Sequence, residues 1–216
     1  AAIFEDRALP AYEATNEYRF RMQAGDIEIE DLERALEKLN NQFEEKPDDE
    51  TLKAERDETR TKLLELKSSE YSERVKLYPT DRFRKFDLGM IEYELGHYDE
   101  AMAQFQASKD EPKLRARAGH MLGRCFLAEQ WYAEAIAELE ETLKSVEATD
   151  SERELAIRYD LMLALLAAAQ DEQNVDHARQ AKTICSDIAR RNITYRDIRA
   201  KRKEVDEVIK NLSGEG

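Results

Sequence analysis

Residues 88–101 read LGMIEYELGHYDEA and residues 122–135 read LGRCFLAEQWYAEA, so residues of the same type return after 34 positions. Self-similarity at a fixed period of this length indicates stacked structural units, and the near absence of strand-forming runs makes those units helical. The repeated anchors are Leu88-Gly89 with Leu122-Gly123, Tyr98 with Tyr132, and Glu100-Ala101 with Glu134-Ala135.

The residue types at these anchors suit a pair of antiparallel helices. Gly89 and Gly123 let a first helix approach a second one closely, and Ala101 and Ala135 do the same from the second helix. Gly96 suits the turn between the two helices. Each pair then buries one face on its own partner and the other face on the next pair, so the pairs are expected to stack.

This pattern resembles the tetratricopeptide repeat, whose signature runs Leu-Gly, then Gly-x-Tyr-x-x-Ala, then an aromatic residue four positions on. Residues 82–115 and 116–149 form the two clear units, and the resemblance covers residues 82–190. Glu92 replaces a usual aromatic residue, and Gln130 replaces the second turn glycine. The matching residues are Leu88, Gly89, Gly96, Tyr98, Ala101 and Phe105 in the first unit and Leu122, Gly123, Phe126, Tyr132, Ala135 and Leu139 in the second.

A third, degenerate unit and a closing helix are expected to follow. The third unit pairs a helix carrying Tyr159, Leu161, Met162 and Leu165 with one carrying Val175, Ala178, Ala181, Cys185 and Ile188. Thr194 is a candidate N-cap for a final helix that would close the open end of the stack. The apolar residues of that helix are Ile198, Val205, Val208, Ile209 and Leu212.

The segment before the repeats is also expected to be helical. Apolar residues from Phe4 to Met22 describe one helical face, and Gly25-Asp26 predicts a break after it. A second helix then carries a seam from Ile29 to Phe43 and ends near Lys46-Pro47. A third begins at the candidate caps Asp48 and Asp49 and ends near Pro79-Thr80, which predicts a long antiparallel helical hairpin.

The composition agrees with an all-α fold. Gly and Pro number only 7 and 4 in 216 residues, and 38% of the residues are charged, which argues against sandwiches, barrels, collagen-like chains and Pro/Gly-rich disorder. The fold predicted is an α-solenoid similar to tetratricopeptide-repeat proteins. It divides into an N-terminal helical segment with the hairpin over residues 1–80, the repeats over 81–195, and a capping helix with a tail over 196–216.

The resemblance implies a concave face lined by the first helix of each repeat. The residues placed there are Phe83, Phe86, Met90 and Tyr93 in the first unit and Arg117, His120, Arg124 and Leu127 in the second. Some family members hold a chaperone's C-terminal carboxylate with a Lys and an Asn, and Phe86 and Met90 stand at those places here. The partner expected is therefore a peptide with acidic residues beside an apolar or aromatic anchor. Alternatively, the N-terminal hairpin covers the aromatic half.

The charge distribution is uneven around a net charge of −14. Residues 1–60 carry 18 acidic and 9 basic side chains, which form either a solvated face or a surface that favours a basic partner. A basic cluster lies near the other end, where it suits an acidic partner, the chain's own N-terminal half, phosphates or solvent alone. Nucleic-acid binding is not expected, because recognition motifs and aromatic platforms are absent. The cluster is Arg190, Arg191, Arg196, Arg199, Lys201, Arg202 and Lys203.

Catalytic, metal and membrane signals are absent from the sequence. The histidines His97, His120 and His177 have no metal-ligand spacing, and Cys125 and Cys185 fall in apolar helical patterns typical of buried thiols. No cofactor motif and no apolar run of membrane-spanning length occurs. The chain opens on Ala1 without an initiator Met, so we interpret it as an excised or processed piece, with a cytoplasmic location expected and a removed upstream signal or anchor still compatible.

The sequence therefore predicts a non-catalytic protein-interaction module, a scaffold or adaptor that binds a peptide or partner in the concave face. The alternative is a structural subunit that forms a homo-oligomer, with the groove filled by its own N-terminal helices.

Overall fold

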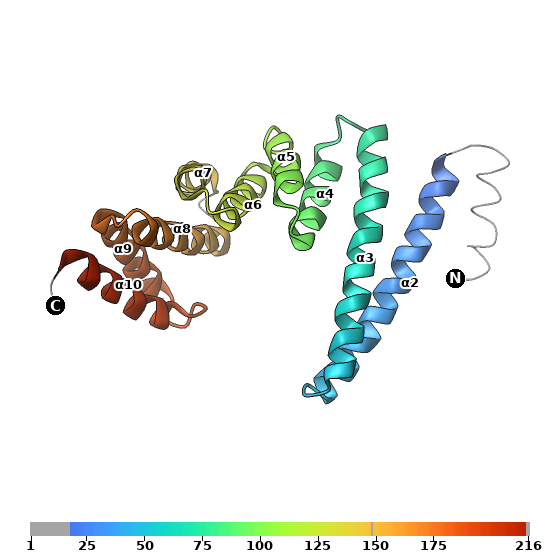
Figure 1. The fold of residues 1–216 in the computed structure, drawn as a ribbon. Coiled ribbons are helices and arrows are strands. Elements are labelled where there is room, and N and C mark those ends of the chain that lie inside the picture. The colour runs from blue at the N-terminus through green and yellow to red at the C-terminus, as the bar shows by residue number, and fades with distance from the viewer. Residues whose placement is uncertain (1–17, 148, 215–216) are drawn as a thin grey trace. The chain divides into compact units, whose positions relative to one another are not determined.

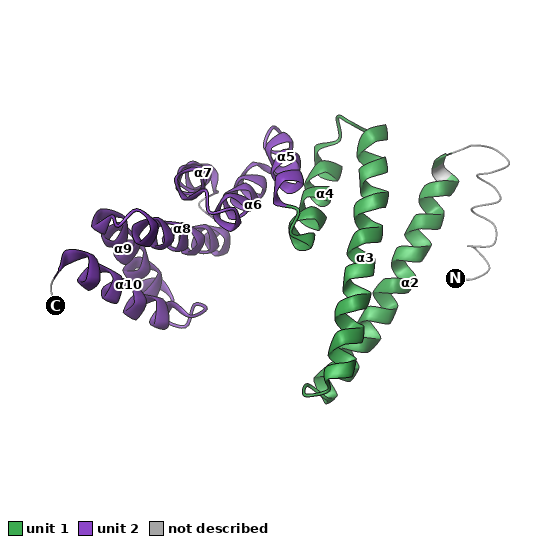
Figure 2. Ribbon diagram, in the orientation of Figure 1, with its two compact units in different colours: residues 1–97 green, residues 98–216 purple. Residues whose placement is uncertain are grey.

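The structure is a computed structural model that describes residues 18–147 and 149–214. The described residues are helical, with short turns and no strand, as the all-α prediction required. They form two compact units, residues 1–97 and 98–216 (Figure 2), which are described separately below. None of the described helices is both long and apolar enough to cross a bilayer. The three-part division made from the sequence stays a prediction.

The first unit is built on a long helical hairpin (Figure 1). Its helices are α2 (Tyr18–Glu45) and α3 (Glu50–Leu77), which pack along each other. Pro47 lies in the short turn between them, and the Asp49 side chain accepts hydrogen bonds from the backbone N–H groups of Thr51 and Leu52. The hairpin and both of its predicted stops are therefore confirmed, and Asp49 is the residue that caps α3.

The break predicted at Gly25-Asp26 was wrong, because α2 runs through both residues without interruption. A Cβ atom at residue 25 would lie 2.4 Å from Glu70 Oε2, so the absence of a side chain at Gly25 leaves room for the buried Glu70 carboxylate of α3. Asp26 in turn pairs with Arg74 of α3. Both residues serve the contact between the helices. The part of the predicted Phe4–Met22 helix that precedes residue 18 lies outside the described residues.

Charged residues are buried inside the hairpin. Glu70 is buried and pairs with Arg21, while Arg74 is buried and its Nη2 lies 2.5 Å from Asp26 Oδ1. Both pairs join α2 to α3, so each buried charge has an oppositely charged partner on the facing helix.

Helix α4 (Arg82–Leu95) completes the first unit and packs on α3. Asp81 caps its N-terminus, and Gly96 ends it with a left-handed φ of 81°, as the sequence predicted for the turn glycine. Glu92 is buried and accepts hydrogen bonds from Ser68 Oγ at 2.5 Å and from His97 Nδ1 at 2.8 Å. These contacts explain how the position usually held by an aromatic residue takes a carboxylate.

The second unit is a series of helices in which each packs on the next. The second predicted repeat forms a helix pair, and a Cβ atom at Gly123 would lie 2.6 Å from Leu139 Cγ, which confirms the close approach expected there. Gln130, at the place of the turn glycine, has a left-handed φ of 62°. The helices are α5 (Tyr98–Ser108), α6 (Arg115–Ala128), α7 (Tyr132–Ser145), α8 (Ser151–Asp171), α9 (Val175–Arg191) and α10 (Ile198–Ser213).

The pair α8 and α9 matches the third predicted unit, and α10 packs on α9 and α8 as the closing helix. Thr194 does not cap α10, because its N–H and hydroxyl bond Asn192 Oδ1 in a turn and Asp197 holds the N-cap position. The Asp197 carboxylate accepts from the Tyr159 hydroxyl instead of a helix N–H group. A contact between distant residues therefore replaces the local cap.

One apolar core runs through the second unit from α7 to α10. It includes Leu139, Ile157, Met162, Leu165 and Val205, each with at most 1% of its surface exposed. Cys125 and Cys185 are both buried, which confirms the prediction from their apolar patterns. Burial raises the pKa of the Cys125 thiol to about 12.

Candidate interaction surface

Helix α6 carries half of the predicted concave face, and two glycines bring it close to α7. A Cβ at Gly119 would lie 2.3 Å from Thr142 Oγ1, and a Cβ at Gly123 would meet Leu139. Helix α6 also contacts α8. Small residues on one side of α6 therefore bring its backbone close to α7.

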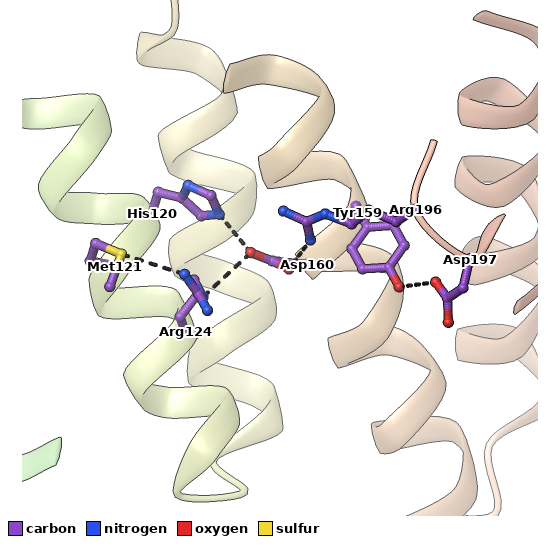
Figure 3. A network of polar contacts seen from close by, with 7 residues as sticks. All are labelled: His120, Met121, Arg124, Tyr159, Asp160, Arg196 and Asp197. Atoms are coloured by element: carbon purple, nitrogen blue, oxygen red, sulfur yellow. Dashed lines mark hydrogen bonds and ion pairs between the residues drawn. The ribbon is translucent and has the colours of Figure 1, made fainter. Parts of the chain in front are cut away.

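A buried carboxylate organises the surface shared by α6 and α8. Asp160 of α8 has a side chain that is only 8% exposed, and three basic groups converge on it (Figure 3). His120 Nε2 lies 2.7 Å from Asp160 Oδ2, and Arg124 Nε lies 3.7 Å from the same oxygen. Arg196 Nη1 lies 3.5 Å from Asp160 Oδ1. Both carboxylate oxygens thus face basic groups, which offsets the desolvation of the charge.

Arg196 reaches this cluster from the turn between α9 and α10. Its backbone has a left-handed φ of 43°, which a non-glycine residue seldom adopts. Its guanidinium carbon lies 4.6 Å from the centroid of the Tyr159 ring and 5.3 Å from that of Tyr195. The two rings and Asp160 together hold the side chain and offset the backbone strain.

Tyr159 contacts three neighbours of Asp160, namely Arg196, Asp197 and Tyr195. Its hydroxyl donates a hydrogen bond to Asp197, and its ring packs edge-on against Tyr195 with centroids 5.8 Å apart. Burial, followed by the hydrogen bond to Asp197 and the charge of that carboxylate, raises the pKa of Tyr159 well above the ordinary tyrosine value. Tyr159 therefore stays protonated across the physiological range and acts as a hydrogen-bond donor.

The structure brings two of the four residues predicted on α6 together. His120 and Arg124 meet at Asp160, and Arg124 Nη1 also lies 3.8 Å from Met121 Sδ. Arg117 is exposed one turn earlier on the same helix. Leu127 is partly buried against the apolar core, so its side chain belongs more to packing than to an open surface.

The four residues predicted on α4 lie in the other compact unit and differ in exposure. Phe86 is 3% exposed and Phe83 is 49% exposed, while Met90 and Tyr93 are partly buried. Helix α4 packs on α3 of the hairpin, and the alternative in which the N-terminal helices cover the aromatic half of this face stays a prediction.

A shallow pocket lies beside His120. Its volume is about 350 Å³, and its other lining residues are Asp150, Glu152, Arg153 and Ala156. Asp150 caps α8 and pairs with Arg153 at 2.6 Å, which lowers the pKa of this carboxyl. The pocket side of His120 is therefore acidic, whereas its Asp160 side adjoins two arginines.

Sequence reasoning did not identify Asp160, Tyr195 or Arg196 as members of this surface, although Arg196 appeared in the basic cluster. Asp160 stands immediately before the apolar run from Leu161 to Ala169, and this position at the edge of an apolar run is the one local signal that could have marked it as a buried, paired carboxylate. Its partners lie 36 and 40 positions away, beyond the reach of any local pattern.

Within the described ranges, no group of three His, Cys, Asp or Glu side chains could hold a metal ion. No protein-family model matches the sequence, and no curated protein is significantly similar to it. The likeness to the tetratricopeptide repeat therefore stays a resemblance carried by the motif residues.

Proposed function

We propose that the chain is a non-catalytic protein-interaction module, a scaffold or adaptor related to tetratricopeptide-repeat proteins, whose α6–α8 surface binds an acidic segment of a partner. The observation that carries the proposal is the pairing of Arg124 and Arg196 on one buried carboxylate. Their side chains are 42% and 48% exposed, so both can still meet a ligand.

Charge supports an anionic ligand at this place. Asp160 offers one negative charge to two arginines, and Arg117 adds a further positive charge on α6. These arginines gather basic side chains on one surface of a protein whose net charge is −14. Guanidinium groups bind carboxylates through paired hydrogen bonds, which favours a Glu- or Asp-containing segment.

Preorganisation supports binding by the same groups. Asp160 fixes the Arg124 side chain, and the two tyrosine rings fix Arg196, before any ligand arrives. Side chains that are already ordered lose less conformational entropy on binding, so a ligand carboxylate gains more net free energy here than at two mobile arginines.

The test compares proteins captured from a lysate of the source organism by the wild-type chain and by an Arg117→Gln/Arg124→Gln variant. The matched control is Arg179→Gln/Arg190→Gln, which removes the same charge from two exposed arginines of α9 paired with Asp176 and Asp187. Phe86 is left intact because truncating a buried aromatic residue would cost core packing.

The expected result is one protein captured by the wild type and the control but at least tenfold less by the α6 variant, with equal helicity by circular dichroism. Equal capture by all three chains would contradict binding at this surface. A purified complex then allows the acidic segment to be mapped by peptide truncation.

A structural self-assembly role is the second candidate, and an exposed apolar patch favours it. Leu77, Tyr78 and Phe83 are each about half exposed around the turn from α3 to α4. Clustered exposed apolar residues are typical of protein interfaces. Light scattering over a range of concentrations tests this role: a stable dimer that Tyr78→Ser/Phe83→Ser converts to a monomer supports it, whereas a monomeric wild-type chain contradicts it.

A further inference from the structure

Trp131 is an exposed aromatic residue held in a fixed position at the turn between α6 and α7. It is the single tryptophan of the chain and is 47% exposed. Its ring stacks on Phe126, with centroids 5.9 Å apart and an interplanar angle of 23°. The stack covers one side of the indole ring and orders it, so the open part is a rigid aromatic platform.

The platform borders an open pocket of about 430 Å³ whose charged lining residues are all acidic. They are Glu134 of α7 and Asp171 and Glu172 at the end of α8. Glu134 and Asp171 take part in no ion pair within the described part of the chain, and Glu172 lies 3.4 Å from His177 Nδ1. We call this the Trp131 pocket.

Helix ends strengthen the negative potential of the Trp131 pocket. The C-terminus of a helix carries partial negative charge, and basic side chains in the last turn usually offset it. Helix α8 has no basic residue in its last turn and ends on Asp171, followed by Glu172. Helix α6 likewise has none and is followed by Glu129. The C-terminal ends of α6 and α8 therefore add negative potential at this edge of the second unit, while Glu134 lies in the first turn of α7.

We propose that the Trp131 pocket binds an arginine or lysine side chain of a basic segment in a partner protein. The indole face attracts a cation through its quadrupole, and tryptophan does so more strongly than the other aromatic residues. The three carboxylates supply the charge complement, and Tyr132 adds a second aromatic lining residue.

This pocket is separate from the Asp160 cluster in residues and in charge. It takes basic groups where the α6–α8 surface takes acidic ones, so one chain would hold two segments of opposite charge. A variant that loses binding at one of the two sites therefore leaves binding at the other site measurable.

The experiment uses a capped tetra-arginine peptide as the probe and Trp131 emission as the reporter. Because the chain has one tryptophan, any change in indole emission reports on this pocket alone. The expected result is a saturable emission change with tetra-arginine, no change with capped tetra-glutamate, and weaker binding as salt rises. An unchanged emission with tetra-arginine would overturn the proposal.

Two charge variants separate the pocket from general attraction to an acidic protein. Glu134→Gln/Asp171→Asn/Glu172→Gln removes the pocket charges, and Glu37→Gln/Glu44→Gln/Glu65→Gln removes the same number from exposed positions of α2 and α3. Affinity is measured by the anisotropy of a fluorophore-labelled tetra-arginine. We expect at least tenfold weaker binding in the first variant and less than a twofold change in the second, whereas equal weakening in both would overturn the proposal.

A variant with two substitutions tests the same pocket with less risk of misfolding than the triple variant. Asp171→Asn/Glu172→Gln removes only the carboxylates at the end of α8, where their loss favours the helix. We expect it to weaken tetra-arginine binding by at least threefold. If Trp131 emission instead changes with protein concentration in the absence of peptide, the occupant is a second copy of the chain, and the proposal of a basic partner segment is overturned.

Discussion

His120 Nε2 of α6 lies 2.7 Å from Asp160 Oδ2 of α8, which joins two elements of the second unit through a carboxylate that is almost fully buried. Arg124 and Arg196 share the same carboxylate. Removing it leaves three basic groups without their common partner. Asp160 is therefore the residue whose substitution should disturb the candidate surface most.

Asp160→Asn should lower the free energy of unfolding by about 2 kcal/mol. The loss is smaller than for a fully buried pair because both arginines are partly exposed to water. Urea unfolding followed by circular dichroism measures it. Asp187→Asn, which removes the exposed partner of Arg190, should cost less than about 0.5 kcal/mol. Equal losses in the two variants would refute the central role of Asp160.

Alkaline stability should depend on Tyr159. Its pKa in the folded protein is raised above 10.0, so its contribution to stability is complete below that pH and is lost as pH rises through and beyond it. The free energy of unfolding of the wild-type chain should therefore fall above pH 10, and Tyr159→Phe should make that fall shallower. Burial also raises the pKa of Tyr195, so some slope remains in the variant. Identical slopes in both chains would contradict this assignment.

Gly123→Ala should destabilise the second unit by about 2 kcal/mol, although alanine is the better helix former. The added methyl would meet Leu139, which is fully buried. Leu139→Ala alone should cost about 3 kcal/mol through the cavity it leaves. The free energy of unfolding lost in the double variant should be smaller than the sum of the two single losses by at least about 1 kcal/mol. The reason is that the shortened side chain at residue 139 leaves room for the methyl group at residue 123. Strict additivity would show that the two residues do not meet.

Both cysteines should resist thiol reagents in the native protein. Cys125 and Cys185 are buried, and burial raises the pKa of both thiols, that of Cys125 to about 12. The reactive thiolate is therefore scarce at neutral pH. Labelling followed by mass spectrometry should find neither modified in the folded chain and both modified in denaturant. Rapid labelling of either in native buffer would contradict the buried placement.

Helix ends were predictable from the sequence where one residue acts locally. Pro47 and Pro79 end helices because proline lacks an N–H group, and Gly96 accepts a left-handed φ that ends α4. Gly25 was misleading because glycine often ends a helix, as Gly96 does. A glycine can mark a break or a close contact, and only the position of Glu70, 45 residues away in the chain, decides between them.

The candidate site was less predictable, because its key contacts join residues far apart in sequence. The resemblance to the tetratricopeptide repeat implied that His120 and Arg124 share one helix face, because it aligned them with the first helix of a repeat. Asp160 and Arg196 enter through the packing of α6, α8 and the α9–α10 turn. The exposed stack of Trp131 on Phe126 also follows from three-dimensional packing.

The charged pairs inside the α2–α3 hairpin have a consequence for its alignment. A seam of leucines repeating every seven residues can pair with its partner in more than one register, with similar apolar contact in each. The pairs Arg21 with Glu70 and Asp26 with Arg74 form in one register only. A slide of one heptad would bury two unpaired charges at a cost of about 3 kcal/mol or more each. The two ion pairs therefore fix the register of α2 against α3. A longer hairpin keeps this register only if the same number of residues is added to both helices between the pairs and the connecting turn.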